Sequence, residues 1–375
     1  MKEYLKVIGI NLVVLGFLVF LFNTLSITAI QVFNWQKPKQ YAKSHLFPNY
    51  RDNPEAALVH FTEYDNLTKG YYESFYGWRR PRIETQTINI DENGLRRTYL
   101  PEDSTPSHTV AFFGGSTMWG TGAPDFGTIP SFVAKKMPSV EAINFGETGY
   151  IAHQSLNLFM KHYFEGFRPD TVVFYDGVND TWNKCRRELD SFSHSREHEM
   201  RIILKEGSDT NPESYLFTIL PIKNLLGKIV RVIESRSREP TSFYDCHDNP
   251  KKAEQVARVL LSDWMIMKTL VEGYGGTFVS ILQPHAYVSE TKLDHLELDE
   301  TLGWQYDAVY PVILELLEDE FSGLQDNFVD LRHSLDKEDY FYIDWCHLSP
   351  NGNELIAADI SEVLQQKMGR TTLAQ

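Results

Sequence analysis

The sequence predicts a three-layer α/β/α fold with a central, mainly parallel five-stranded sheet, preceded by one N-terminal transmembrane helix. Two observations indicate the sheet. Short apolar runs alternate with longer segments of helical periodicity, and Gly, Ser, Asn and Asp residues cluster directly after several of these runs, where a sheet of this type binds its ligands. A long apolar stretch at the N-terminus indicates the transmembrane helix.

The apolar runs predict five strands, and the periodic segments predict the helices between them. The strands are expected at 109–113, 140–145, 171–175, 277–282 and 328–331. The helices are expected at 129–137, 153–165, 250–274, 299–321 and 350–368. Strands that alternate with helices in this way are typical of a parallel sheet with helices on both faces.

The N-terminal stretch reads VIGINLVVLGFLVFLF over residues 7–22 and stays weakly apolar to residue 33. A membrane-spanning helix needs about 20 such residues. No clean small-x-small cleavage site follows, so an uncleaved anchor is favoured over a removed signal peptide or a buried core helix. Lysines flank the stretch on both sides, so charge does not fix the orientation. Because long domains translocate largely regardless of charge, we expect a single-pass protein whose bulk is extracytoplasmic, in the periplasm or at the cell surface.

Composition excludes several classes of protein. With 36 basic and 51 acidic side chains the net charge is −15, and an acidic surface repels phosphate backbones, so nucleic acid is not an expected partner. A hydrophobic fraction of 42% is enough for a real core. Three cysteines are too few for a disulfide-framework miniprotein or a four-cysteine zinc site. Cys185 and Cys246 either pair in an oxidising compartment or stay free thiols, since sequence cannot fix pairing.

Three regions are expected along the chain. Residues 1–33 form the membrane anchor, and 34–108 form a juxtamembrane region with a β-hairpin over 85–98 around Asn93-Gly94. Residues 109–370 form the α/β domain. A charged and polar stretch at 181–249 interrupts its strand–helix rhythm and is expected to be an insertion, with a helix near 222–235.

Four short blocks at predicted strand ends or before the last helix carry the chemically informative residues. They are GGST at 114–117, NFGETG at 144–149, GVND at 177–180 and DWCH at 344–347. Each block alone is commonly a turn or a helix cap. Their combination, in this order and at these places, favours a functional site.

The four blocks together resemble the SGNH/GDSL hydrolase superfamily, over about residues 109–368. The resemblance implies that Ser116 is the nucleophile, that Gly149 and Asn179 belong to the oxyanion hole, and that Asp344 and His347 complete the catalytic triad. One departure is visible, because the familiar Gly-Asp-Ser-Leu string is Gly-Gly-Ser-Thr here. The residues with chemical roles remain, so the departure is interpreted as a subfamily difference.

The residue types suit serine-dependent acyl chemistry. A serine hydroxyl is a weak nucleophile until a base such as His347 takes its proton, and Asp344 would orient the imidazole and stabilise its cation. The backbone amides of Ser116 and Gly149 and the side-chain amide of Asn179 would hold the oxyanion. This chemistry implies no cofactor and no metal ion.

Five further residues near the blocks are weaker candidates for contact with substrate. Aromatic rings could form a sugar platform or line an acyl pocket, and they could equally be ordinary core. The histidine after the fourth strand could touch substrate or be a structural hydrogen-bonding residue. These residues are Trp119, Tyr150, Trp182, Trp345 and His285.

The leading hypothesis is an anchored esterase or deacetylase that acts outside the cytoplasm through an acyl-enzyme on Ser116. Its expected substrate is an acylated glycan of the cell envelope, an exported polysaccharide, or a small ester. An O-acyltransferase with the same triad and a sugar acceptor is the first alternative. A non-catalytic glycan-binding module, or a partner of envelope polysaccharide machinery, is the second.

Overall fold

The computed structural model describes residues 1–35, 41, 43–67, 70–102, 104–197, 200–201 and 243–373. The chain divides into two compact units, one of residues 1–39 with 198–242 and one of residues 40–197 with 243–375. The predicted helix near 222–235 lies outside the described residues.

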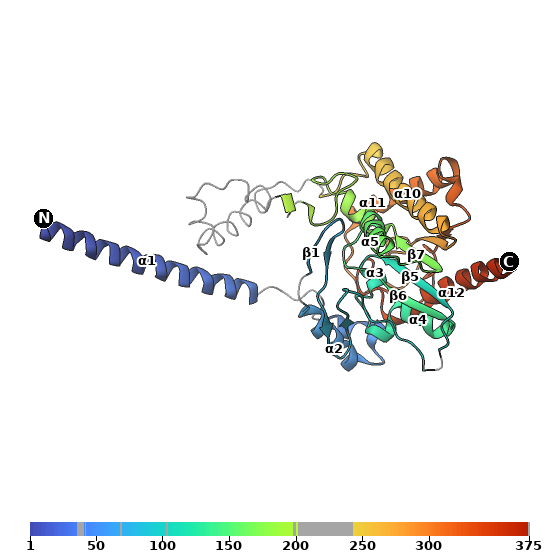
Figure 1. Cartoon of the computed structure of the whole chain (residues 1–375), viewed down its shortest axis with the longest axis horizontal. Coiled ribbons are helices and arrows are strands. Elements are labelled where there is room, and N and C mark those ends of the chain that lie inside the picture. The colour runs from blue at the N-terminus through green and yellow to red at the C-terminus, as the bar shows by residue number, and fades with distance from the viewer. Residues whose placement is uncertain are drawn as a thin grey trace. The chain divides into compact units, whose positions relative to one another are not determined.

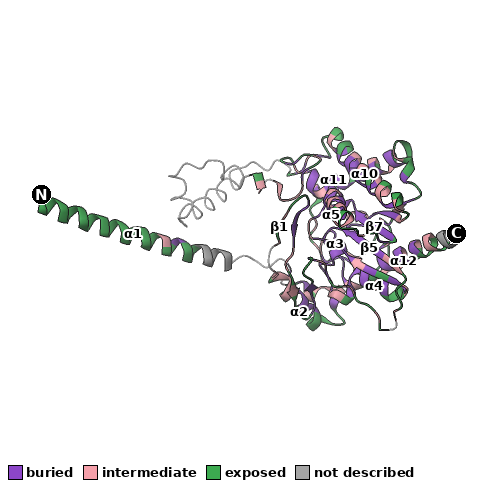
Figure 2. Cartoon of the chain, in the orientation of Figure 1, coloured by how far each residue is buried: buried purple, intermediate pink, exposed green. Residues whose placement is uncertain are grey.

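The first unit contains one long apolar helix, α1 (Lys2–Trp35). Within it, the stretch Lys2–Ala29 is long and apolar enough to cross a membrane, and none of its most apolar window is buried inside the protein. Figure 2 shows α1 as a largely exposed helix. Exposed apolar side chains over such a length suit a lipid environment. That the anchor is uncleaved, and that the rest of the chain is extracytoplasmic, stay predictions.

The second unit is built on one five-stranded parallel sheet. Its strands are β5 (His108–Gly114), β6 (Val140–Asn144), β7 (Thr171–Asp176), β8 (Thr277–Leu282) and β9 (Phe328–Asp330). They lie in the order β6-β5-β7-β8-β9, and all four pairings are parallel. Every residue of the central β7 is buried, as expected where helices cover both faces of a parallel sheet.

Helices cover both faces of the sheet (Figure 1), which confirms the predicted fold class. On one face, α4 (Ile129–Lys136) and α12 (Pro350–Leu373) pack on alternate strand residues such as Val110 and Phe112. On the other face, α5 (Ala152–Phe164) and α10 (Pro250–Gly273) pack on the sheet, and α11 (Glu300–Asp319) packs on α10. The alternation follows from the two-residue period of a strand.

Residues 41–102, which we call the wrap segment, belong to the same compact unit as the sheet. Its elements are α2 (Pro54–Asp65), β1 (Tyr71–Glu73), β2 (Gly77–Arg79), β3 (Ile83–Glu84) and β4 (Asn89–Ile90), with short 3-10 turns at Ser44–Leu46 and Pro48–Tyr50. An isolated antiparallel bridge joins Arg96 to Asn144 at the end of β6. The segment expected as a juxtamembrane region therefore contributes to the fold that holds the site.

The hairpin expected over 85–98 differs in detail. The turn at Asn93-Gly94 is present, because Gly94 donates to the carbonyl of Asp91 and has a φ of +77°. The paired strands, however, are β3 and β4, and after the turn only one bridge joins Ile90 to Arg96. At Arg96 the chain also bridges Asn144 at the end of β6, and the side chain of Arg96 is buried.

Candidate active site

The nucleophile candidate, Ser116, is the first residue of a short helix, α3 (Ser116–Trp119), directly after β5. The turn into this helix needs a glycine before the serine. A Cβ atom on Gly115 would lie 2.2 Å from the side-chain nitrogen of Asn179, closer than atoms can pack. The turn therefore brings the backbone next to Ser116 against the amide of Asn179.

The structure brings Ser116, His347 and Asp344 together in one chain of hydrogen bonds. Ser116 Oγ lies 2.6 Å from His347 Nε2, and His347 Nδ1 lies 2.6 Å from Asp344 Oδ2. The other carboxylate oxygen accepts the backbone N–H groups of Cys346 and His347, at 2.9 and 2.8 Å. The loop thus fixes its own carboxylate, which in turn orients the imidazole toward the serine.

The electrostatics of the loop keep Asp344 ionised. Burial raises the pKa of the Asp344 carboxyl, but the charge and hydrogen bonds of His347 outweigh burial and bring the pKa down to about 2. For the neighbouring Cys346, burial and then the charge of Asp344 raise the thiol pKa well above its usual range. A neutral buried thiol is a poor nucleophile, so Ser116 remains the candidate.

Among the described residues, one group of Asp, Cys and His side chains is close enough to hold a metal ion, with donor atoms within 4.8 Å of one another. It consists of Asp344, Cys346 and His347. The fit is poor, because the Asp344 and His347 atoms are already engaged with each other and with Ser116.

The predicted oxyanion residues lie on the two loops beside Ser116. Asn179 is in the first turn of α6 (Val178–Lys184), directly after β7, and its amide donates to the carbonyl of Tyr150 at 2.8 Å. Gly149 precedes Tyr150 and has a φ of +78°, which few residues other than glycine adopt. The hydrogen bond therefore ties the two predicted oxyanion loops together.

A buried ion pair between Asp180 and Lys184 stabilises these two loops. The carboxylate of Asp180 accepts the backbone N–H of Ala152 at the start of α5, and Lys184 donates to it at 2.9 Å. Both side chains are fully buried. Since each charge has a partner, the pair is tolerated in the core, and it positions the turn that carries Asn179.

Arginines of the wrap segment contact the loops that follow β5 and β6. The guanidinium of Arg96 donates to the carbonyls of Trp119, Gly120 and Ala123 after the nucleophile helix, and it pairs with Asp125 at 3.0 Å. Its charge lies 4.2 Å from the centre of the Trp119 ring.

Two further arginines hold the loop after β6. Arg79 donates to the carbonyl of Phe145 at 3.1 Å, and Arg80 pairs with the buried Glu147 at 3.2 Å. Sequence reasoning missed all three arginines, because nothing in their local pattern distinguishes them from surface arginines.

Tyr41 is a further residue at the triad that sequence reasoning missed. Its hydroxyl donates to Asp344 Oδ2 at 2.8 Å and lies 3.2 Å from His347 Nδ1. The side chain is 3% exposed. No motif surrounds this tyrosine, and 303 residues separate it from Asp344, so no local signal could have found it.

Three of the weaker candidates lie buried in the core, and the structure gives no support to their contact with substrate. Trp119 is fully buried between the guanidinium groups of Arg80 and Arg96. Tyr150 is buried and its hydroxyl donates to the carbonyl of Trp78. Both follow a strand end closely, but closeness along the chain does not decide which way a ring points.

The third is His285, which packs between aromatic rings with centroids 4.1 Å from Tyr306 and 4.8 Å from Tyr310. Burial lowers the pKa of this imidazole to about 3, so it is a neutral core residue. The apolar surroundings favour the uncharged ring.

Trp182 and Trp345 are half-buried, and their ring centroids lie 6.0 Å apart. Trp182 donates its indole N–H to the hydroxyl of Tyr244 at 3.0 Å. Trp345 lies two residues before His347. Their partial exposure beside the triad loop leaves contact with substrate as a prediction.

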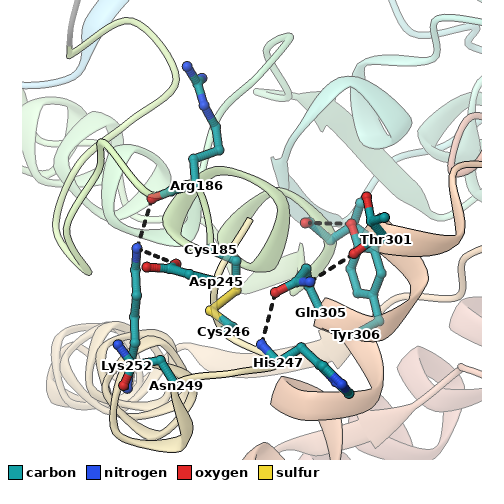
Figure 3. Close-up of a disulfide and its surroundings, with 11 residues drawn as sticks. Cys185, Arg186, Asp245, Cys246, His247, Asn249, Lys252, Thr301, Gln305 and Tyr306 are labelled. Carbon is teal, nitrogen blue, oxygen red and sulfur yellow. Dashed lines mark hydrogen bonds and ion pairs between the residues drawn. A yellow bond between two sulfur atoms is a disulfide. The ribbon is translucent and has the colours of Figure 1, made fainter. Parts of the chain in front are cut away.

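Cys185 and Cys246 form a disulfide directly after α6 (Figure 3). Their Cα atoms lie 5.1 Å apart, at a sequence separation of 61. Beside the bond, Lys252 pairs with Asp245 at 2.8 Å and donates to the backbone carbonyl of Arg186 at 2.7 Å. The disulfide therefore joins the two ends of the expected insertion close to the turn that carries Asn179.

The sequence matches no protein-family model and no curated protein. Solved structures similar to the chain include a member of the lipolytic G-D-S-L family from Veillonella parvula, with 12% identity and a TM-score of 0.39, which covers 68% of this chain and 98% of that one. A catalytic mutant of an acetylxylan esterase from Geobacillus stearothermophilus is 14% identical, with a TM-score of 0.36 and coverage of 68% and 92%.

A carbohydrate acetylesterase family member from Sinorhizobium meliloti is 15% identical, with a TM-score of 0.36 and coverage of 70% and 99%. The similar structures thus include a member of the G-D-S-L family, which the four sequence blocks resemble. At such identities and TM-scores the similarity does not bear on the reaction or the substrate.

Proposed function

We propose that the chain is an SGNH-type serine esterase that cleaves acyl esters through an acyl-enzyme on Ser116. The continuous hydrogen-bonded chain Ser116–His347–Asp344 carries this proposal. A base within hydrogen-bond reach of a serine, oriented in turn by a carboxylate, is the arrangement that activates a hydroxyl nucleophile.

The reaction proceeds in two steps. Ser116 Oγ attacks the ester carbonyl while its proton passes to His347, and the imidazolium then protonates the departing alcohol oxygen as the ester C–O bond breaks. Water attacks the resulting acyl-serine and gives its proton to His347. Release of the acid returns a proton to Ser116 Oγ. In both steps Asp344 stabilises the imidazolium.

The oxyanion that forms in each step needs donors placed in advance. The amide of Asn179 is held against the turn before Ser116, and the backbone amides of Ser116 and Gly149 are proposed as the other donors. This role fits the way Asp180 and Lys184 fix the Asn179 turn.

We further propose a small acyl group on an extracytoplasmic glycan as the substrate. The apolar helix α1 suits a membrane anchor, and a disulfide suits an oxidising compartment outside the cytoplasm. The partly exposed rings of Trp182 and Trp345 are suited to a sugar face.

The test follows acetate release from 4-nitrophenyl acetate and from an acetylated polysaccharide, with the full chain in detergent micelles. Ser116→Ala is expected to lower kcat at least about 10³-fold, because loss of the nucleophile removes the acyl-enzyme route. Ser322→Ala, at an exposed serine of the same domain, is the matched control and should be unchanged. Equal rates for wild type and Ser116→Ala would overturn the proposal.

A sugar acceptor in the same assay distinguishes hydrolysis from transfer. Hydrolysis predicts that acetate accounts for all acyl groups released and that added unacetylated glycan stays unmodified by mass spectrometry. Serine-dependent acetylation of the glycan would replace the esterase proposal with an O-acyltransferase that uses the same triad.

A further inference from the structure

The wrap segment supplies a buried hydroxyl to the triad. Tyr41 donates to Asp344 Oδ2, the same oxygen that lies 2.6 Å from His347 Nδ1. A hydroxyl that donates its own proton keeps lone pairs free, so it can also accept from the imidazole N–H, 3.2 Å away. Tyr41, Asp344 and His347 thus form a closed group of three.

Packing leaves Tyr41 little freedom to turn away. Its ring stacks on Phe61 of α2, with centroids 5.6 Å apart, and meets the ring of Tyr64 edge-on at 5.3 Å. Tyr64 in turn contacts Trp119 at the end of the nucleophile helix, with centroids 5.9 Å apart. Helix α2 therefore supports the acid–base loop and the serine helix at once.

From these contacts we infer that Tyr41 is a positioning residue of the triad, which fixes the Asp344–His347 pair from the anchor-proximal end of the chain. The inference rests on the proposed function. Tyr41 follows Trp35, the last residue of α1, by six positions. The residue that completes the acid–base pair is therefore encoded next to the anchor rather than within the four blocks.

The role has a definite physical consequence. A donor on the Asp344 carboxylate disperses its negative charge, so the carboxylate stabilises the imidazolium less strongly than a bare one would. Without the hydroxyl, both contacts to the Asp344–His347 pair are lost, and the acidic limb of the pH–rate profile should shift. The orientation of the ring should also become less defined, which lowers kcat rather than substrate affinity.

Other titratable groups around Asp344 stay neutral over the working range. They are Tyr64 from α2, Tyr50 from the wrap segment and Cys346 from the loop itself. Burial is the largest effect in each, and it raises the pKa of Tyr50 and of Cys346 well above the usual value and that of Tyr64 above it. A cation, Arg80, lies beside Tyr64 with its charge 6.0 Å from that ring, and it is paired with Glu147. A shift of the profile is therefore assigned to the triad.

The experiment compares Tyr41→Phe with Tyr50→Phe in the full chain in micelles. Tyr50 is a matched control, because it lies in the same apolar cluster and its buried hydroxyl donates to the carbonyl of Gly122 instead of the triad. Tyr41→Phe should lower kcat on 4-nitrophenyl acetate about three- to tenfold with KM little changed. It should also shift the midpoint of the acidic limb of kcat/KM.

Tyr50→Phe should leave both quantities unchanged even where it lowers the melting temperature. Equal pH profiles for wild type and Tyr41→Phe, or the same shift in both variants, would reduce Tyr41 to a packing residue and overturn the inference.

A readout independent of turnover separates this inference from the proposed function. In protein with ¹⁵N-labelled histidine, the Nδ1–H resonance of His347, assigned with His347→Gln, should move in Tyr41→Phe and stay in place in Tyr50→Phe. If ester turnover does not depend on Ser116 but this resonance moves, the proposed function fails and the positioning role stands. If turnover depends on Ser116 and the resonance does not move, the positioning role fails alone.

Discussion

In the central sheet, site residues are placed by the backbone. Ser116 and Asn179 lie directly after β5 and β7, whose parallel ladder fixes both strand ends through many hydrogen bonds. In the wrap segment, by contrast, several contacts to the site run through single side chains. Arg96 alone holds three carbonyls after the nucleophile helix, and Tyr41 alone reaches Asp344.

The two regions should therefore respond differently to mutation. A ladder distributes its stabilisation over many peptide groups, so one side-chain change alters it little. A buried guanidinium concentrates several hydrogen bonds and a charge in one residue, and removing it takes that donor from several acceptors at once. Substitutions in the wrap segment should therefore be severe for folding, and well-chosen ones at the strand ends should be severe for chemistry.

The largest effect is expected for Arg96→Met, which keeps much of the side-chain length but removes the charge. The ion pair of the buried Arg96 with Asp125 is broken, and the carbonyls of Trp119 and Ala123 lose this donor, while Gly120 keeps the N–H of Ala123, so the free energy of unfolding should fall by about 3–5 kcal/mol. Urea denaturation followed by circular dichroism measures it. Arg97→Met is the matched control, because Arg97 is exposed and its substitution should change stability by less than about 0.5 kcal/mol. Similar losses for both would contradict the comparison.

The next effect is expected for Gly115→Ala, at a strand end. The new methyl group would overlap the Asn179 amide, 2.2 Å away, and displace that proposed oxyanion donor. Loss of one such donor lowers kcat by about 10²- to 10³-fold. Gly273→Ala adds a methyl group where no atom lies within 4 Å and should keep full activity. If Gly115→Ala retained wild-type kcat, Asn179 would not be a donor in the reaction.

The smallest effect is expected for Asp176→Asn, inside the sheet region. Burial, followed by the charge of Asp180, raises the pKa of the Asp176 carboxyl well above its ordinary value. Between the ordinary and the raised pKa the unfolded chain loses this proton and the folded chain keeps it, so wild-type stability falls as pH rises. The variant lacks this loss of stability, which in the wild type is at most about 1.4 kcal/mol for each pH unit.

Melting temperatures of wild type and Asp176→Asn, measured from pH 4 to pH 8, test this sign. The variant should gain on wild type as pH rises, and its indole partner Trp264 keeps an oxygen to donate to. A gain that grows toward low pH would show that Asp176 is ionised in the folded protein.

The two regions also differ in how far their sequences predict them. Strand β7 was predicted within one residue, because a β-branched run followed by Asp176-Gly177 is a local signal. The positions of Ser116 and Asn179 after β5 and β7 follow from the same rule, since residues at the carboxyl ends of parallel strands meet, whereas the place of His347 was implied by the family resemblance of its block. The strand-end rule therefore predicts that Ser116 and Asn179 lie at one edge of the sheet, and the family resemblance adds Asp344 and His347.

Local patterns could not predict the contacts of the wrap segment. Arg96 resembles the adjacent Arg97 in sequence, yet one is buried and the other exposed, because burial depends on partners 23 to 29 residues away. For the same reason Trp119 was interpreted as a candidate substrate contact, although its ring points into the core. The distance of a residue from a motif along the sequence does not indicate which way its side chain points.

The disulfide between Cys185 and Cys246 bears on how this chain tolerates change. A covalent bond that is also present in the unfolded protein closes the loop in both states, so the length of the chain between the cysteines has little effect on the free energy of folding. To the rest of the domain, Cys185 and Cys246 are a fixed entry and exit for the chain between them. A change in the length of that chain should therefore alter the stability of the domain little, so insertions should be tolerated better between the cysteines than within the sheet.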